Sequence, residues 1–167
     1  VMFNSGQSCC AVERIYVDTH VYDEFIERAI EITNSYVVGD PNQHSTTLGP
    51  MVNGASAEKV RNHIDQAFKA GAIPLIDGSK FGLSNDQTNF VTPQLLTNVE
   101  HTMAIMSEET FGPVAGIMRV ESDEEAICLI NDSRYGLTAS IWSEDELKAY
   151  SIGDSLNVGT VFMNRCD

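Results

Sequence analysis

Basic side chains are scarce in this sequence of 167 residues. Ten Lys and Arg residues stand against 24 Asp and Glu residues, which gives a formal net charge of −14 at pH 7. Proteins bind a nucleic-acid backbone or an anionic lipid surface through clustered Lys and Arg side chains, and this sequence contains no such cluster. The composition therefore predicts neither nucleic acid nor membrane as a partner.

Long apolar runs and regularly spaced cysteines are also lacking. No apolar stretch approaches the roughly 20 residues of a membrane-spanning helix, and the first residues do not follow the order of a signal peptide, which predicts a soluble, cytoplasmic protein. The four cysteines form no CxxC motif and the four histidines share no ligand spacing, so neither a disulfide framework nor a metal site is predicted. We expect Cys128 to pack on the apolar face of a helix and Cys166 to be exposed.

An initiator methionine is absent, because the sequence begins at Val1. We therefore expect a fragment of a longer protein. A length of 167 residues with 43% hydrophobic side chains suffices for one ordinary core, which predicts a single compact domain over residues 1–167.

Hydrophobic periodicity predicts strands and helices in alternation. Residues 12–17 and 73–76 have the pattern of strands, and residues 22–33 repeat apolar side chains at helical spacing. A second helix is expected with Ser56 as its N-cap and Gly71 at its C-terminal end, because these residue types favour those positions. Further apolar runs predict strands, and one polar stretch predicts a loop: residues 114–120, 137–142 and 160–163 for the strands, and 77–90 for the loop.

Two capping-box patterns predict the starts of two more helices. Ser122 is followed three residues later by Glu125, and Ser143 is followed in the same way by Glu146. Strands that alternate with helices need crossover connections, which place the strands parallel and cover the sheet with helices. The predicted fold class is α/β, with an open, mostly parallel sheet and helices on both faces.

Two adjacent thiols, Cys9 and Cys10, follow a glycine-containing turn and precede a predicted strand. A cysteine on such a loop is a candidate nucleophile when a neighbouring group favours its thiolate. The alternative is that both side chains are small buried hydrophobes, the usual role of an unpaired cysteine. Local pattern alone leaves both interpretations open.

Two separated motifs in this sequence resemble signatures of the aldehyde dehydrogenase superfamily. The first resembles the segment around that family's active-site cysteine and reads Asn4-x-Gly6-Gln7-x-Cys9-x-Ala11-x-x-Arg14. The second resembles the family's Glu-Glu-x-Phe-Gly-Pro signature and reads Ser107-Glu108-Glu109-Thr110-Phe111-Gly112-Pro113-Val114. Further similarity extends over most of the chain, through residues 38–41, 48–50, 131–137 and 159–164.

The resemblance implies a catalytic role for Cys9 and cofactor contacts for Glu109 and Phe111. In the family, the thiolate at the position of Cys9 adds to an aldehyde, and the thiohemiacetal is oxidised by NAD or NADP to a thioester that water hydrolyses to a carboxylic acid. Glu109 corresponds to the Glu that binds the nicotinamide ribose, and Phe111 corresponds to the Phe beside the nicotinamide. Cys10 corresponds to a neighbour without required chemistry, and Asn4 is a weaker candidate that could simply form the turn.

The family's general-base Glu, one oxyanion-binding Asn and the dinucleotide-binding domain find no match in this sequence. We therefore expect the 167 residues alone to be inactive, and, by the same resemblance, to belong to a homodimer or tetramer. Two alternatives stay open. One is a cysteine-dependent hydrolase or acyl-transfer enzyme with a base such as His101, and the other is a non-catalytic oligomerisation module.

Overall fold

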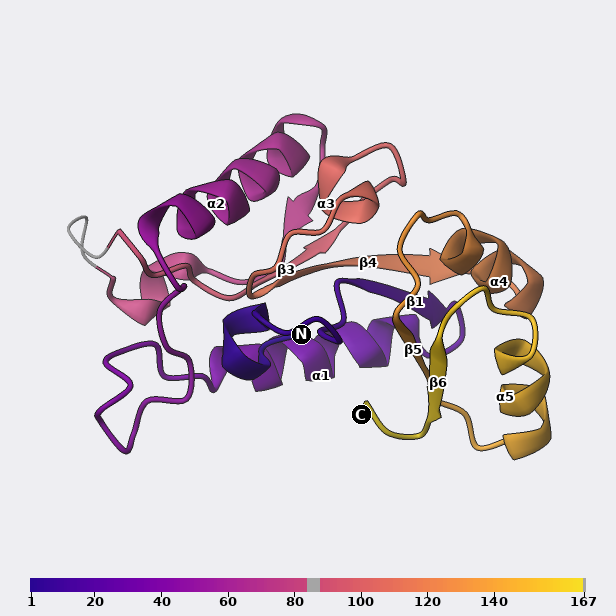
Figure 1. Ribbon diagram of the computed structural model, residues 1–167. Helices are drawn as coiled ribbons and strands as arrows, with labels where there is room; N and C mark the ends of the chain where they lie inside the picture. The colour runs from indigo at the N-terminus through magenta and orange to yellow at the C-terminus, as the bar shows by residue number, and fades with distance from the viewer. Residues whose placement is uncertain (84–87, 167) are drawn as a thin grey trace. The chain divides into compact units, whose positions relative to one another are not determined.

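The chain is described here by a computed structural model that covers residues 1–83 and 88–166 (Figure 1). It forms two compact units, Val1–Arg119 and Val120–Asp167, and each is described by itself. Part of the predicted loop 77–90, namely residues 84–87, lies outside the described residues.

A four-stranded sheet forms the centre of the first unit. Its strands are β1 (Arg14–Asp18), β2 (Ile73–Pro74), β3 (Gln94–Thr97) and β4 (Val114–Val120), and their order in the sheet is β1-β4-β3-β2. β3 and β4 run parallel, with Leu95 opposite Ala115, whereas β2 pairs antiparallel with β3.

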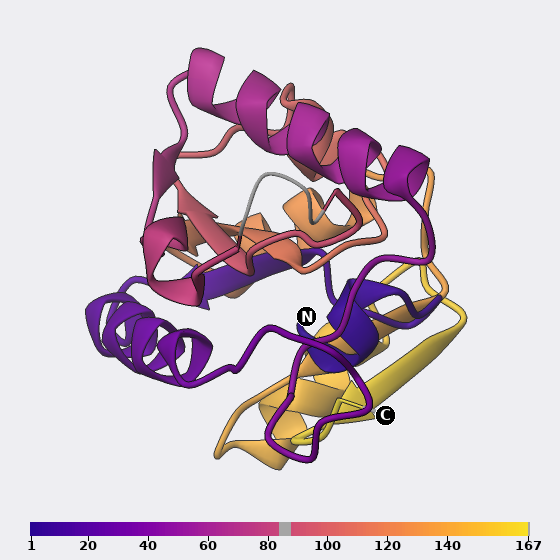
Figure 2. The ribbon, with the colours of Figure 1, turned by 90° about the vertical axis from the view of Figure 1, so that its left-hand side faces the viewer.

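Helices cover both faces of this sheet. Figures 1 and 2 show α1 (Tyr22–Asn34) on one side, and α2 (Gly54–Lys69) with the short α3 (Ala104–Ser107) on the other. Because successive side chains of a strand point to opposite faces, neighbouring residues enter different cores. Leu96 and Val114 are buried with the apolar face of α2, while Leu95 and Ala115 are buried on the side that α1 covers.

The second unit contains a smaller parallel sheet. Its elements are α4 (Asp123–Asn131), β5 (Thr138–Ile141), α5 (Glu146–Gly153) and β6 (Thr160–Met163), and β5 and β6 pair in parallel over their full length. Asn131 joins the end of α4 to the approach to β6, because its side chain donates to the Ser155 carbonyl oxygen and accepts from the Asn157 N–H. Both units thus confirm the α/β class with mostly parallel strands and flanking helices.

The predicted cap of α2 is wrong by three residues. The N-cap is Asn53, whose Oδ1 accepts the Ser56 N–H at 2.8 Å. Ser56 was expected to cap the helix because serine is a common N-cap residue. Instead, its backbone N–H is the donor that the Asn53 side chain caps. Gly71 follows the C-terminal cap Ala70 with a φ of 104°, which is a backbone conformation that glycine adopts readily.

Only one of the two predicted capping boxes caps a helix. Ser122 Oγ accepts the Glu125 N–H at 3.2 Å and begins α4 as expected. The prediction at Ser143 is wrong, because its Oγ accepts from the nearby Asp145 N–H, and Asp145 then caps α5 by accepting from Lys148 N–H.

Several short elements went unpredicted from the sequence. These are β3, α3 and two 3-10 turns, Phe3–Gly6 and Gly78–Phe81. β2 is shorter than the predicted 73–76, because the N–H and carbonyl oxygen of Ile76 bond to the Gln94 side chain instead of to a strand.

The second unit also corrects a prediction about a cysteine. Cys128 is exposed on α4, so its expected packing is wrong, whereas Cys166 is exposed as expected. In the described part of the chain, no helix has the length and apolar character needed to cross a membrane.

Candidate active site

A left-handed turn positions the predicted nucleophile. Asn4, Ser5 and Gly6 have φ values of 50°, 57° and 71°, a region that L-residues rarely occupy and that Gly and Asn tolerate best. The chain then turns toward β1, and Cys9 is exposed while Cys10 is half-buried. The exposed side chain of Cys9 excludes the alternative that it is a buried hydrophobe.

Hydrogen bonds to residues 49–52 hold this turn in its unusual conformation. Ser5 Oγ donates to the Gly49 carbonyl oxygen at 2.7 Å. Gln7 Oε1 accepts the Val52 N–H at 2.7 Å, and Gln7 Nε2 donates back to the Asn4 carbonyl oxygen at 3.1 Å. A backbone in a strained region persists only when its surroundings over-determine it, and these bonds provide that restraint.

The second motif leaves α3 as a bent segment that leads into β4. Phe111 has a φ of 57° and is half-buried, whereas Thr110 is only 2% exposed. The Glu13 carboxylate accepts both consecutive backbone N–H groups, from Thr110 to Oε2 and from Phe111 to Oε1, each at 2.8 Å. One side chain that precedes β1 therefore satisfies two donors that no helix or sheet could use.

Two residues of α2 support the same segment from the other side. Lys59 Nζ donates to the Glu109 carbonyl oxygen at 2.6 Å, and His63 Nδ1 shares a 3.0 Å hydrogen bond with Thr110 Oγ1. Burial lowers the pKa of His63 below its ordinary value, and the neighbouring Lys59 charge lowers that pKa further. A neutral imidazole is thus favoured beside Thr110.

The two motifs meet through their backbones. A Cβ atom added to Gly6 would lie 2.0 Å from the carbonyl oxygen of Gly112, so only glycine permits this approach. The structure therefore brings the cysteine loop into contact with the segment that carries Glu109 and Phe111, although more than 100 positions separate Gly6 from Gly112 in the sequence.

Glu109 and Phe111 offer different surfaces at this site. The Glu109 side chain is exposed, and among the described residues its carboxylate has no hydrogen-bond or ion-pair partner. The roles of Glu13, Lys59 and His63 at this site were not predicted from the sequence. Glu13 occupies an undefined position of the cysteine motif, and the two α2 residues come from a helix whose surface pattern carried no signal.

Comparison with known proteins decides the family. A family model described as the aldehyde dehydrogenase family matches residues 1–167, the full length of the chain. The chain belongs to the aldehyde dehydrogenase family. Human mitochondrial aldehyde dehydrogenase is 36% identical over 167 residues, which are 100% of this chain and 32% of that protein.

Solved aldehyde dehydrogenase structures share the fold. Betaine aldehyde dehydrogenase from Staphylococcus aureus, in complex with NAD+, gives a TM-score of 0.86 at 32% identity and covers 97% of this chain and 32% of its own. Succinic semialdehyde dehydrogenase from Streptococcus pyogenes, with NADP+, gives a TM-score of 0.90 at 31% identity and covers 98% and 35%. The chain thus spans about a third of the length of the aldehyde dehydrogenases it matches.

His101, the candidate base of the alternative cysteine-dependent hydrolase, is hydrogen-bonded to a residue of β1. Its Nε2 shares a 2.7 Å hydrogen bond with the Tyr16 hydroxyl on β1. Within residues 1–83 and 88–166, no group of three or more His, Cys, Asp or Glu side chains is arranged to hold a metal ion.

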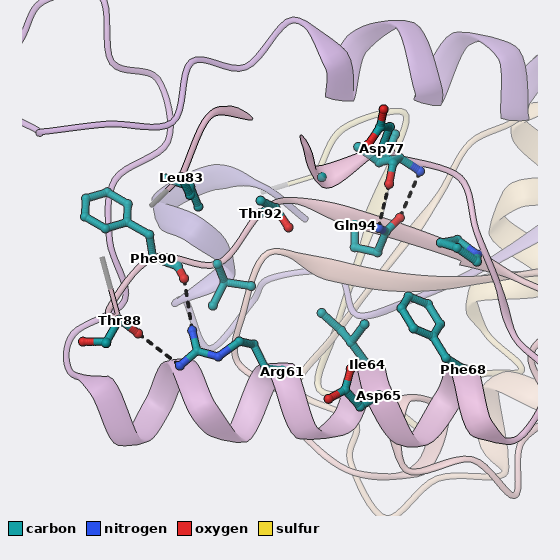
Figure 3. Close-up of a pocket in the computed structure, with 14 residues that line it drawn as sticks. Arg61, Ile64, Asp65, Phe68, Asp77, Leu83, Thr88, Phe90, Thr92 and Gln94 are labelled. Atoms are coloured by element: carbon teal, nitrogen blue, oxygen red, sulfur yellow. Dashed lines mark hydrogen bonds between the residues drawn. The ribbon is translucent and has the colours of Figure 1, made fainter. Parts of the chain in front are cut away.

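A hollow of about 790 Å³ in the first unit contains none of the aldehyde dehydrogenase motif residues. Figure 3 shows that it lies between α2 and residues 88–94, with Phe68 and Phe90 beside polar groups. Arg61 is already engaged there, because it donates to the carbonyl oxygens of Thr88 and Phe90. The residues that line this hollow are therefore different from those that form the cysteine site.

Proposed function

We propose that this chain is the nucleophile-bearing catalytic part of an NAD(P)-dependent aldehyde dehydrogenase, with Cys9 as the nucleophile. The observation that carries the proposal is the backbone contact between Gly6 and Gly112, because it joins the two family motifs into one site. Exposure of Cys9 at the same loop leaves its sulfur accessible to a substrate.

Cys9 begins the reaction by adding its thiolate to the aldehyde carbon, which forms a C–S bond and leaves negative charge on the former carbonyl oxygen. The backbone N–H of Cys9 is a candidate donor to that oxyanion. Glu109 and Phe111 would hold NAD or NADP, which when bound would accept the hydride that the thiohemiacetal on Cys9 loses as it becomes a thioester. Water then attacks the thioester, which releases a carboxylic acid and returns the thiol of Cys9.

The residues present fit a nicotinamide cofactor. Ribose hydroxyls need an acceptor, and the exposed Glu109 carboxylate is available for them. A nicotinamide ring needs an aromatic or apolar neighbour, and Phe111 provides one from a segment that Glu13 and Lys59 hold in place. Relatives in complex with NAD+ and with NADP+ support either cofactor for the whole enzyme.

The chain alone lacks groups that the reaction requires, since it spans about a third of its relatives. We assign the general base, the second oxyanion donor and the dinucleotide-binding domain to the remainder of the full-length protein. Holding the reactants close together in the correct orientation accounts for much of an enzyme's rate acceleration. The purified 167-residue chain should therefore give no aldehyde-dependent NADH or NADPH, and formation of either would contradict this part of the proposal.

Paired cysteine substitutions test the proposal in the full-length protein that contains this chain. Cys9→Ala should lower aldehyde-dependent reduction of NAD(P)+ by more than about a thousandfold, because removing a nucleophile removes its whole pathway. Cys10→Ala is the matched control and should retain activity within about threefold. If Cys10→Ala were inactive and Cys9→Ala active, the assignment of the nucleophile would be wrong.

We also propose that the full-length enzyme is a cytoplasmic homodimer or homotetramer. The oligomer rests on the family membership of the chain, and the location rests on the cytosolic aldehyde dehydrogenases among its relatives, which also include mitochondrial ones. Light scattering of the full-length protein at several concentrations should give a mass of two or four subunits, and a monomer at every concentration would overturn it.

A further inference from the structure

We infer that Glu13 is a positioning residue that sets the cofactor-contact segment relative to the nucleophile, an inference that rests on the proposed function. Glu13 lies four positions after Cys9, and its carboxylate binds the backbone of Thr110 and Phe111. It is therefore the side chain that links the cysteine loop directly to the segment of Glu109 and Phe111.

The geometry of the link is specific. Both carboxylate oxygens are used, one for each of two consecutive N–H groups, at 2.8 Å. A charged acceptor makes such bonds shorter and stronger than a neutral one. The two consecutive N–H groups converge on one carboxylate, and such a pair of backbone donors suits an anion.

The backbone of Glu13 is itself held in place, so its side chain can set the position of the segment that it binds. Its carbonyl oxygen accepts the Gly116 N–H of β4 at 3.2 Å, which anchors its backbone to the sheet. Its side chain then reaches the segment that enters the same strand. The backbone contact of Gly6 with Gly112 closes this link from the other side, so the cysteine loop and the cofactor-contact segment are joined at two points.

Loss of the carboxylate should free the segment without disturbing the cysteine. Thr110 is 2% exposed, so its N–H would lose its acceptor in a place that bulk water does not reach. The segment would then shift, and displacement of a cofactor contact by about 1 Å can cost on the order of a hundredfold in rate. Cys9 keeps its own restraints through Ser5 and Gln7.

The test compares Glu13→Gln and Glu13→Ala in the full-length protein. Glutamine keeps one acceptor and turns an N–H donor toward the other backbone N–H, whereas alanine removes both acceptors. The KM for NAD(P)+ should rise about tenfold in Glu13→Ala and by less in Glu13→Gln, while the KM for aldehyde at saturating cofactor stays within about twofold. Alkylation of Cys9 by iodoacetamide without cofactor should keep its wild-type rate within about twofold.

A matched control separates this role from the general loss of a carboxylate. Glu125 also accepts a backbone N–H, from Glu121 at 2.7 Å, but it lies in the second unit. Glu125→Gln should leave the KM for NAD(P)+ unchanged. Wild-type cofactor KM in both Glu13 variants would overturn the inference, and so would a loss of Cys9 alkylation that parallels the loss of cofactor binding.

Hydrogen exchange distinguishes failure of the inference from failure of the proposed function. The amides of Thr110 and Phe111 should exchange at least about tenfold faster in Glu13→Gln than in the wild type, whatever the activity. Unchanged exchange there overturns the role of Glu13. Absence of aldehyde-dependent turnover in the wild-type full-length protein would instead refute the proposed function.

Discussion

At the scale of single residues, the site depends on two glycines that face each other. Gly6 combines a φ of 71° with the close approach to the Gly112 carbonyl oxygen. Gly112 has no room for a side chain either, because a Cβ there would lie 2.4 Å from Val60 Cγ2 of α2. Gly6 is therefore needed for proximity and for backbone freedom, and Gly112 is needed for proximity.

Gly6→Ala should destabilise the protein by about 2 to 5 kcal/mol. A left-handed alanine costs about 1 to 2 kcal/mol, and overlap with a backbone oxygen adds about 1 to 3 kcal/mol. Gly82→Ala is the control, because Gly82 has a φ of 62° but nothing within 4 Å of its added Cβ. Chemical denaturation should show a loss of only about 1 kcal/mol for Gly82→Ala, and equal losses would contradict the steric argument.

The lowered pKa of His63 should make the folding stability of the protein depend on pH. Its folded-state pKa is lowered from 6.5, first by burial and then by the Lys59 charge, so the unfolded chain binds a proton more readily. The stabilisation is therefore complete above the unfolded value of 6.5 and is lost as the pH falls through the folded-state pKa. The midpoint denaturant concentration of His63→Gln should fall less than that of the wild type upon acidification through this window, and identical pH profiles would contradict this prediction.

At the scale of elements, the cap of α2 offers a direct comparison of two polar residues three positions apart. Asn53→Ala should cost about 1 kcal/mol of stability, because the Ser56 N–H loses its acceptor. Ser56→Ala removes a hydroxyl with no capping role and should cost less than about 0.5 kcal/mol. Thermal denaturation of the two variants checks the order, and a larger loss in Ser56→Ala would restore the cap expected from the sequence.

The longer elements could be predicted because their apolar pattern is long enough to be read. α1 repeats apolar side chains at helical spacing and β4 is a continuous apolar run, and both appear at the expected places. β3 was missed because it has only four residues and begins with the polar Gln94, so it offers neither a long apolar run nor an alternation. The start of α5 was misplaced because Ser143 and Asp145 are both good caps, and Asn164 decides between them by accepting the Ser143 N–H.

The residues of the candidate site also divide into those that could be predicted from the sequence and those that could not. Cys9, Glu109 and Phe111 could be proposed from the sequence because family motifs mark them. Glu13, Lys59 and His63 could not, since their roles are contacts between segments distant in sequence, and no local pattern encodes such a contact.

At the scale of the whole molecule, the two units differ in how much core they possess. The first unit has a buried cluster on each face of its sheet. In the described part of the second unit, the buried apolar side chains are Val120 and Ala149 alone. A segment of this length rarely folds with so little buried apolar surface.

Expression of the units separately should therefore give different results. Residues 1–119 should show a cooperative thermal transition by circular dichroism, whereas residues 120–167 should show none. The full chain measured under the same conditions is the control. A cooperative transition in residues 120–167 alone would show that its two strands and two helices suffice as a folding unit.

The edge strand β2 affects the tendency of the protein to aggregate at high concentration. β2 is an edge strand of two residues, Ile73–Pro74, and Pro74 has no N–H to offer to an incoming strand. An exposed edge normally acts as a template on which foreign strands stack into fibrils. A short edge that contains a proline blocks such growth, so this border of the sheet resists aggregation even though Ile73 is exposed there.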